Sequence, residues 1–146
     1  MNIIRITSDQ RDIVEPTWLA RAEAVHRELR PHLSSDYAEQ MAGIFADGGE
    51  MIVAVDGEEV RGVAVYRVFR DTFSGRKLYV DDLVTTSARR SQGVGKLLLD
   101  WLKQEASRRQ AANLMLDSGT QRTEAHRFYF REGLVIPSFN FRISID

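Results

Sequence analysis

The feature that most constrains this chain is a glycine-containing turn between an apolar strand pattern and a long helical pattern. Residues 78–85 predict a strand, Gly93 and Gly95 follow, and apolar residues then recur at helical spacing over about residues 92–109. Glycines at a helix start leave backbone N–H groups unhindered, which suits a phosphate group. The turn lacks the Lys-Ser or Lys-Thr pair of a P-loop and the third glycine of a dinucleotide fingerprint. It therefore predicts either an anion-binding helix start or a plain turn.

The segments before and after the glycine-containing turn add further distinctive residues. The turn carries Arg90, Gly93 and Gly95, residues 78–84 form an apolar strand with two adjacent aspartates, and residues 125–133 contain a Phe-Tyr pair before a glycine. In this order the three segments resemble the GNAT acetyltransferase superfamily, whose signature is Gln or Arg, two residues, Gly, one residue, then Gly or Ala. The resemblance implies an acyltransferase enzyme that moves an acetyl group from acetyl-CoA to an amine.

The rest of the chain predicts one mixed α+β domain over residues 1–146. Both the residue patterns and the resemblance indicate the GNAT fold. This is a central sheet of six or seven strands, mostly antiparallel with one splayed parallel pair, flanked by about four helices. The expected strands cover residues 3–6, 51–55, 60–69, 78–85, 113–117 and 139–145, and the expected helices begin near residues 15, 36, 92 and 123.

The composition excludes several kinds of protein and of chemical site. The 20 Lys and Arg residues nearly balance the 21 Asp and Glu residues, so the strongly basic field of a general nucleic-acid binder is absent. Without cysteine there can be no disulfide, thiolate metal site or cysteine acyl-enzyme, and nothing in the sequence implies a metal. No apolar run suggests a membrane span or a signal peptide, so a cytoplasmic protein is expected. A homodimer formed through an exposed strand edge stays open.

The resemblance assigns donor binding to the glycine-containing turn and to the strand before it. In the family, amides at this helix start hold the pyrophosphate of coenzyme A. A bulge splays the strand so that its backbone pairs with the pantetheine arm, and the Leu83 N–H would stabilise the oxyanion. Arg122 stands where many relatives carry Asn, and it offers a cation near phosphate or substrate. The implied cofactor-binding residues are Leu83, Val84, Thr85, Arg90, Gln92, Gly93, Val94, Gly95, Lys96, Arg122 and Tyr129.

Three residues are candidates for proton transfer. Asp81 and Asp82 are adjacent in an apolar strand, where regular alternation would place one on each face. The family carries its base at one of these positions, and Asp82 is favoured over Asp81; a salt bridge to an arginine or a solvated strand face is the alternative. Tyr129, four residues before Gly133, has the spacing of the family tyrosine that protonates the departing thiolate. A purely structural aromatic is the alternative.

The expected reaction is direct attack by a small-molecule amine on acetyl-CoA in a ternary complex, with a protein or peptide amine as the alternative acceptor. A non-catalytic coenzyme A-binding sensor is the rival from another class, because it needs the turn but neither Asp82 nor Tyr129. A domain binding some other phosphate ligand is a further rival. In the family, acceptor specificity comes from the first two helices and the last strands, which here offer Glu23, His26, Tyr37, Glu39, Gln40, Ser138, Asn140 and Arg142.

Overall fold

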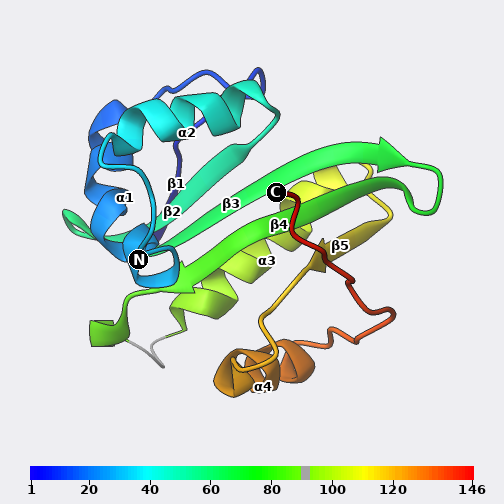
Figure 1. Ribbon diagram of the computed structural model, residues 1–146. Coiled ribbons are helices and arrows are strands. Elements are labelled where there is room, and N and C mark those ends of the chain that lie inside the picture. The colour runs from blue at the N-terminus through cyan, green and yellow to red at the C-terminus, as the bar shows by residue number, and fades with distance from the viewer. Residues whose placement is uncertain (90–92) are drawn as a thin grey trace. The chain divides into compact units, whose positions relative to one another are not determined.

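The computed structural model describes every residue except 90–92 and divides into two compact units, Met1–Met115 and Leu116–Asp146 (Figure 1). The single domain expected from the sequence stays a prediction. The elements of the first unit and of the boundary are β1 (Asn2–Arg5), α1 (Pro16–Leu29), α2 (Tyr37–Ala46), β2 (Glu50–Asp56), β3 (Glu59–Asp71), β4 (Gly75–Thr85), the short 3-10 helix η1 (Ser87–Arg89), α3 (Val94–Arg108) and β5 (Asn113–Leu116); the second unit contains α4 (Thr123–Arg131).

The sheet has the strand order β1-β2-β3-β4-β5. Strands β1 to β4 pair antiparallel with their neighbours. The chain then crosses over through α3, and β5 returns beside β4 in the same direction, with the Ala112 N–H donating to the Arg76 carbonyl at 2.7 Å. The mixed α+β fold, the parallel pair and four α-helices in the described part of the chain confirm the predicted architecture.

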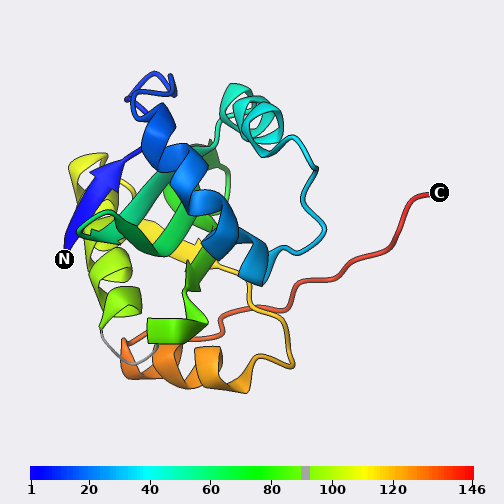
Figure 2. The same ribbon diagram turned by 90° about the vertical axis from the view of Figure 1, so that its left-hand side faces the viewer.

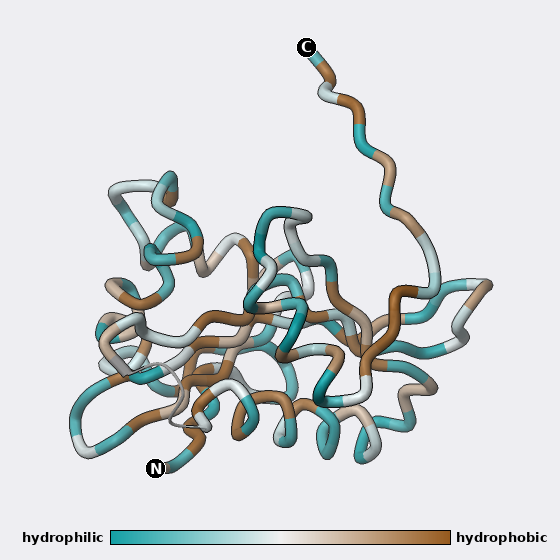
Figure 3. The backbone as a smooth tube through the Cα atoms, turned by 90° about the horizontal axis from the view of Figure 1, so that it is seen from below, coloured by the Kyte–Doolittle hydropathy of each residue, from teal (hydrophilic) through white to brown (hydrophobic). Residues whose placement is uncertain are grey.

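The predicted last strand over residues 139–145 is wrong: this segment contains no strand, and the described residues form five strands rather than six or seven. Its apolar residues alternate as a strand would, which Figure 3 shows along the chain toward its C-terminus. They are strongly exposed, however, with Phe139 and Phe141 at 83% and 91%. Alternation fixes which side chains share a face, but a strand also needs a neighbouring backbone to complete its hydrogen bonds.

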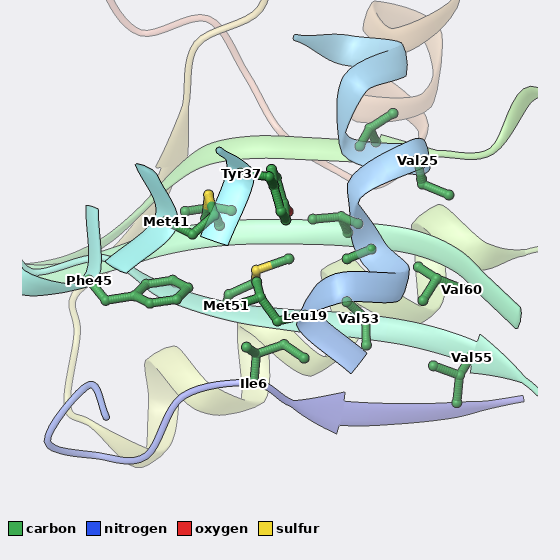
Figure 4. Packing of buried hydrophobic residues seen from close by; sticks show 14 residues of the cluster. Ile6, Leu19, Val25, Tyr37, Met41, Phe45, Met51, Val53, Val55 and Val60 are labelled. Carbon is green, nitrogen blue, oxygen red and sulfur yellow. The ribbon is translucent and has the colours of Figure 1, made fainter. Parts of the chain in front are cut away.

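Helices cover both faces of the sheet in the first unit (Figures 1 and 2). Helices α1 and α2 lie on one face and α3 lies on the other. Pro16 opens α1, where its missing N–H costs no hydrogen bond. Asp36 caps α2 by accepting the Glu39 N–H at 3.1 Å. The core beneath α1 and α2, shown in Figure 4, includes Ile6, Leu19, Val25, Tyr37, Met41, Phe45, Met51, Val53, Val55, Val60, Val63, Val65 and Val84.

Close packing at Gly62 brings the start of α3 against the sheet. A Cβ atom at this residue would lie 2.8 Å from both Leu98 Cδ1 and Val94 Cγ1, so β3 and α3 approach more closely than a side chain permits. Gly62 pairs with Thr85, the last residue of β4. The first turn of α3 is therefore held beside the end of β4.

Helix α3 begins at Val94, with Gly93 as its N-cap in the left-handed region at φ 79°. Residue 92, where the sequence places the helix start, lies outside the described residues. Replacing Gly93 by Ala is expected to lower the free energy of unfolding by about 1 kcal/mol, because an L-residue in this conformation is strained. Gly43 in α2 has equally open surroundings but no such backbone conformation. Its replacement by Ala should raise the free energy of unfolding by about 0.5–1 kcal/mol. Urea unfolding followed by circular dichroism checks both, and destabilisation by both variants would contradict this account.

Candidate active site

A β-bulge interrupts β4 at the two adjacent aspartates. Val65 of β3 pairs with Asp82 whereas Tyr66 pairs with Val80, so Asp81 is an extra residue in β4. The resemblance implies a bulge in this strand, and it is present. Both residues of such a bulge lie opposite a single residue of the neighbouring strand, so regular alternation is lost there.

The bulge places both carboxylates on the face that α1 covers, and the prediction of one carboxylate on each face is wrong. Asp82 lies opposite Val65, which belongs to the core beneath α1. The Asp81 carboxylate contacts Arg67, which is two residues from Val65 along β3 and therefore on the same face. Whether a strand contains a bulge depends on how it pairs with its neighbour. The sequence of β4 alone therefore does not show that Asp81 is the extra residue.

Asp82 is the end of a buried chain of hydrogen bonds. Its Oδ2 lies 2.7 Å from His26 Nε2, and His26 Nδ1 lies 2.8 Å from the Tyr37 hydroxyl. His26 is only 1% exposed. With a single ring proton, this network is satisfied when His26 Nε2–H donates to Asp82 and Nδ1 accepts from the Tyr37 hydroxyl. His26 of α1, itself held by Tyr37 of α2, thus orients the Asp82 carboxylate.

Asp82 is held in its ionised form. Burial opposes ionisation, but hydrogen bonds from His26 and from Arg30, whose Nε donates to Asp82 Oδ1 at 2.9 Å, outweigh it and keep the pKa of Asp82 below its usual value. Tyr37 responds in the opposite direction, because burial and the nearby charges of Glu23 and Asp82 raise its pKa. Asp82 is therefore charged, and Tyr37 protonated, at neutral pH.

Asp81 forms a two-pronged ion pair with Arg67, whose Nε and Nη2 each donate to the carboxylate at 2.8 Å. The Arg67 guanidinium also lies over the rings of Phe69 and Tyr79, 5.2 and 5.4 Å from their centroids. The alternative that the sequence leaves open for these aspartates, a salt bridge to an arginine, thus describes contacts that both of them make. Partnership with an arginine does not exclude chemistry, because a carboxylate accepts up to about four hydrogen bonds.

Beyond the bulge, one edge of β4 faces away from β3. The Thr86 N–H donates to the Arg61 carbonyl of β3 at 2.8 Å, so by alternation the amide of Leu83 points away from β3, toward the β5 side. On that side β5 ends four residues after Ala112, whereas β4 continues nine residues after Arg76, its partner. The last residues of β4 thus extend past the end of β5, which suits pairing with an extended ligand.

The start of α3 offers amides to an anion. Among the described residues no side chain caps this helix, and the space around Gly93 is open. Val94 is buried and Gly95 lies in the first turn, while Lys96 is exposed and forms an ion pair with Asp100 at 3.3 Å. These features fit the pyrophosphate of coenzyme A. Arg90 and Gln92, also predicted to bind it, lie outside the described residues.

The second unit brings Tyr129 and Arg122 together. Tyr129 on α4 is buried, and burial raises the pKa of its hydroxyl, an effect that the charge and hydrogen bond of Arg122 partly offset. Arg122 immediately precedes α4. His126 has a structural contact, with its Nε2 lying 2.8 Å from the Gly119 carbonyl. Arg122 therefore favours proton loss from the Tyr129 hydroxyl.

The sequence did not indicate Arg30 and Arg67 as site residues, and it placed His26 and Tyr37 with the acceptor rather than with Asp82. One signal was present: His26 falls within the apolar stripe of α1, among Leu19, Ala22 and Val25. A buried polar side chain needs a hydrogen-bond partner, and a carboxylate in an apolar strand needs one too. Nothing comparable marked Arg67, which is one of many arginines in the chain.

No group of three or more His, Cys, Asp or Glu side chains in the described part of the chain is arranged to hold a metal ion. No helix among the residues described combines the length and the apolar character needed to cross a membrane.

Comparison with known proteins gives relatives in sequence and a structure with a shared fold. The chain is 45% identical over 69 residues to the uncharacterized N-acetyltransferase YhdJ of Bacillus subtilis (strain 168), covering 47% of this chain and 49% of the relative. It is 31% identical over 86 residues to the aminoalkylphosphonate N-acetyltransferase of Salmonella typhimurium (strain LT2), covering 59% of this chain and 56% of the relative. The matches thus span about half the length of these relatives.

The structure of AAC(6')-Iy in complex with the bisubstrate analogue CoA-S-monomethyl-acetylneamine has the same fold. It superposes with a TM-score of 0.83 at 14% identity over 99% of this chain and 97% of the other. The profile of the acetyltransferase (GNAT) family matches residues 11–133, which include the bulged strand, the glycine-containing turn and α4. The chain belongs to the acetyltransferase (GNAT) family.

Proposed function

We propose that the chain is an acetyl-CoA-dependent N-acetyltransferase that acetylates a primary amine of a small molecule by direct attack in a ternary complex. The observation that carries this proposal is the bulge at Asp81. It accompanies an open β4 edge toward which the Leu83 amide points, and a pair of carboxylates on the face beneath α1. An electrophile bound along the edge and an amine held near the carboxylates are the two requirements of acyl transfer.

Donor binding would use the backbone more than side chains. The first-turn amides of α3, opened by Gly93, would hold the pyrophosphate, with Lys96 as a nearby cation. Leu83, Val84 and Thr85 at the end of β4 would lie along the pantetheine arm. Arg90, Gln92 and Arg122 complete the proposed donor-binding set, on the resemblance alone. When bound, acetyl-CoA supplies the thioester whose acyl group is transferred.

The chain's own residues would move two protons. The amine nitrogen attacks the thioester carbonyl carbon, a C–N bond forms and the C–S bond breaks. Asp82 takes the amine proton, directly or through water, with Asp81 as the alternative base; the Leu83 N–H stabilises the oxyanion. Tyr129 donates its hydroxyl proton to the departing thiolate. Since His26 and Arg30 keep Asp82 ionised, its base form is available throughout the neutral range.

Two relatives support a small-molecule acceptor. One is by name an aminoalkylphosphonate N-acetyltransferase, and the structure of AAC(6')-Iy contains an acetylneamine joined to coenzyme A. Both names describe amines of small molecules. We therefore place a small-molecule amine before a protein or peptide amine, in a cytoplasmic reaction.

The test is thermal unfolding of the purified protein with and without acetyl-CoA, followed by thiol release with a panel of amines. Ligand at a hundredfold its dissociation constant should stabilise the native state by about 2.7 kcal/mol, which appears as a rise in Tm. ADP at the same concentration is the control for general phosphate binding. No shift with acetyl-CoA would contradict the proposal, and an equal shift with ADP would favour another phosphate ligand. A shift without thiol release from any amine would favour the non-catalytic sensor.

A further inference from the structure

Two guanidinium groups flank the bulge on the face that carries both carboxylates. Arg30, from the end of α1, donates through Nε to Asp82 Oδ1 at 2.9 Å and through Nη2 to the Asp81 carbonyl at 3.1 Å. Arg67, from β3, donates through Nε and Nη2 to the Asp81 carboxylate. Both cations are thus fixed to the same backbone residue, one by its carbonyl and one by its side chain.

Each guanidinium has one nitrogen that these contacts do not use. Among the residues the structure describes, neither Arg30 Nη1 nor Arg67 Nη1 has a hydrogen-bond partner. The two side chains are 41% and 40% exposed, so these groups are not sealed within the core. A guanidinium carries five N–H donors in a planar fork that matches the oxygens of a carboxylate or phosphonate. Their aspartate partners hold the forks in place before any ligand arrives, which reduces the entropy cost of binding.

The charges on this face are mixed rather than acidic. Asp81, Asp82, Arg30 and Arg67 have formal charges that sum to zero. An acceptor with several positive charges and no negative one would bring cations near Arg30 and Arg67, and like charges held a few ångströms apart repel. An acceptor with one amine and one anion would instead match both kinds of group.

We propose that the acceptor carries an anionic group on the same small molecule as its amine, and that Arg30 and Arg67 bind this anion while Asp82 receives the amine. This inference rests on the proposed N-acetyltransferase function. Phosphonate, phosphate ester and carboxylate share the required chemistry, namely two or three oxygens that accept N–H donors. Arg30 and Arg67 are thus assigned as determinants of acceptor specificity.

The experiment compares four primary amines that differ in the group at the other end of the molecule: a phosphonate, a carboxylate, a methyl group or a second amine. Thiol release with acetyl-CoA at pH 8 is measured for 2-aminoethylphosphonate, β-alanine, propylamine and 1,3-diaminopropane. The wild-type kcat/KM is expected to be at least about tenfold higher for an anionic acceptor than for propylamine, and lowest for the diamine, since hydrogen bonds between charged groups are stronger than neutral ones. The ratio between 2-aminoethylphosphonate and β-alanine identifies the preferred anion.

Variants test which residues are responsible. Arg67→Gln should lower kcat/KM for the preferred anionic acceptor about tenfold or more, chiefly through KM, and change that for propylamine less than threefold. Arg30→Gln also removes a hydrogen bond from Asp82, so it should lower kcat/KM for every acceptor, but about tenfold more for the anionic acceptor than for propylamine. Arg70→Gln is the matched control. Arg70 is exposed on β3, three residues from Arg67 and therefore on the opposite face, so this variant should behave as wild type.

Three results would overturn the inference. Equal kcat/KM for propylamine and the anionic acceptors would do so while leaving the acetyltransferase function intact. An equal loss for all acceptors in Arg67→Gln and Arg30→Gln would show that these residues only support the structure around Asp81 and Asp82. No thiol release with any amine would refute both proposals, and the Tm shift with acetyl-CoA would show whether donor binding survives.

Discussion

Replacing Tyr129 by Phe is expected to lower kcat about 10²- to 10⁴-fold, the usual contribution of a positioned acid or base. Phe keeps the buried ring of α4 but removes the hydroxyl proton that we propose for the departing thiolate. The Tm shift with acetyl-CoA should persist, because Phe leaves the amides at the start of α3 unchanged. Steady-state thiol release at saturating acetyl-CoA measures the effect.

Tyr66→Phe is the matched control for this prediction. Tyr66 is fully buried, and its hydroxyl has no hydrogen-bond partner among the described residues. Removing it should leave kcat within about twofold and should not destabilise the protein, since no hydrogen bond is lost. If Tyr129→Phe also retained near-wild-type kcat, Tyr129 would be a packing residue and another group would supply the proton.

The Tyr129 hydroxyl, proposed as the acid, should also keep its proton to high pH in the wild-type protein. Burial raises the pKa of Tyr129, so the hydroxyl holds its proton beyond the usual tyrosine range near 10. We therefore expect no loss of kcat from this group between pH 7 and 9.

Replacing Asp82 by Asn is expected to lower kcat/KM about 10²- to 10⁴-fold, because Asn cannot accept the amine proton. Asp81→Asn should have a smaller effect, since it removes a carboxylate that Arg67 already holds in a two-pronged ion pair. Thiol release by both variants, compared at equal concentrations of folded protein, measures the difference. The reverse order of effects would assign the base role to Asp81.

Asp82→Asn should also change stability. Arg30 and His26 would lose a charged partner, which costs about 1–3 kcal/mol for a largely buried group. The pKa of Asp82 is lowered in the folded state, so its contribution is present above the unfolded carboxyl pKa near 4 and is lost as pH falls through the folded pKa. Urea unfolding of wild type and variant at pH 6 and pH 3 should therefore differ most at pH 6.

The elements that could be predicted from sequence are those set by nearby residues. Pro16, the Asp36 cap and the apolar spacing of α3 are local signals, and each marks an element that the structure contains. The wrong predictions concern features that depend on pairing between strands. Residues 139–145 have the pattern of a strand but form none, and Asp81 leaves the alternation of β4 because of its register with β3. Neither the missing strand nor the bulge can be predicted from the sequence of its own segment.

The candidate site shows the same division. Leu83, Gly93 and Tyr129 were indicated by motif spacing along the chain, and their roles stay predictions. Arg30 and Arg67 were not indicated, because their distance in sequence from Asp82 carries no information about contact. Burial offers the remaining clue: a charged strand residue needs counter-charges, and these come from whichever element packs against it.

The bulge at Asp81 affects two parts of the proposed site, the carboxylate pair and the β4 edge proposed to bind the donor. In a regular strand, neighbours i and i+1 can never share a face, so a contiguous Asp-Asp pair would divide its charge between opposite sides of the sheet. A bulge both gathers such a pair on one side and increases the local bend and twist of its strand. In the proposed site, amine capture on the face of the sheet and donor access at its edge would therefore have a common geometric origin, and a sequence change at this point in β4 would alter both at once.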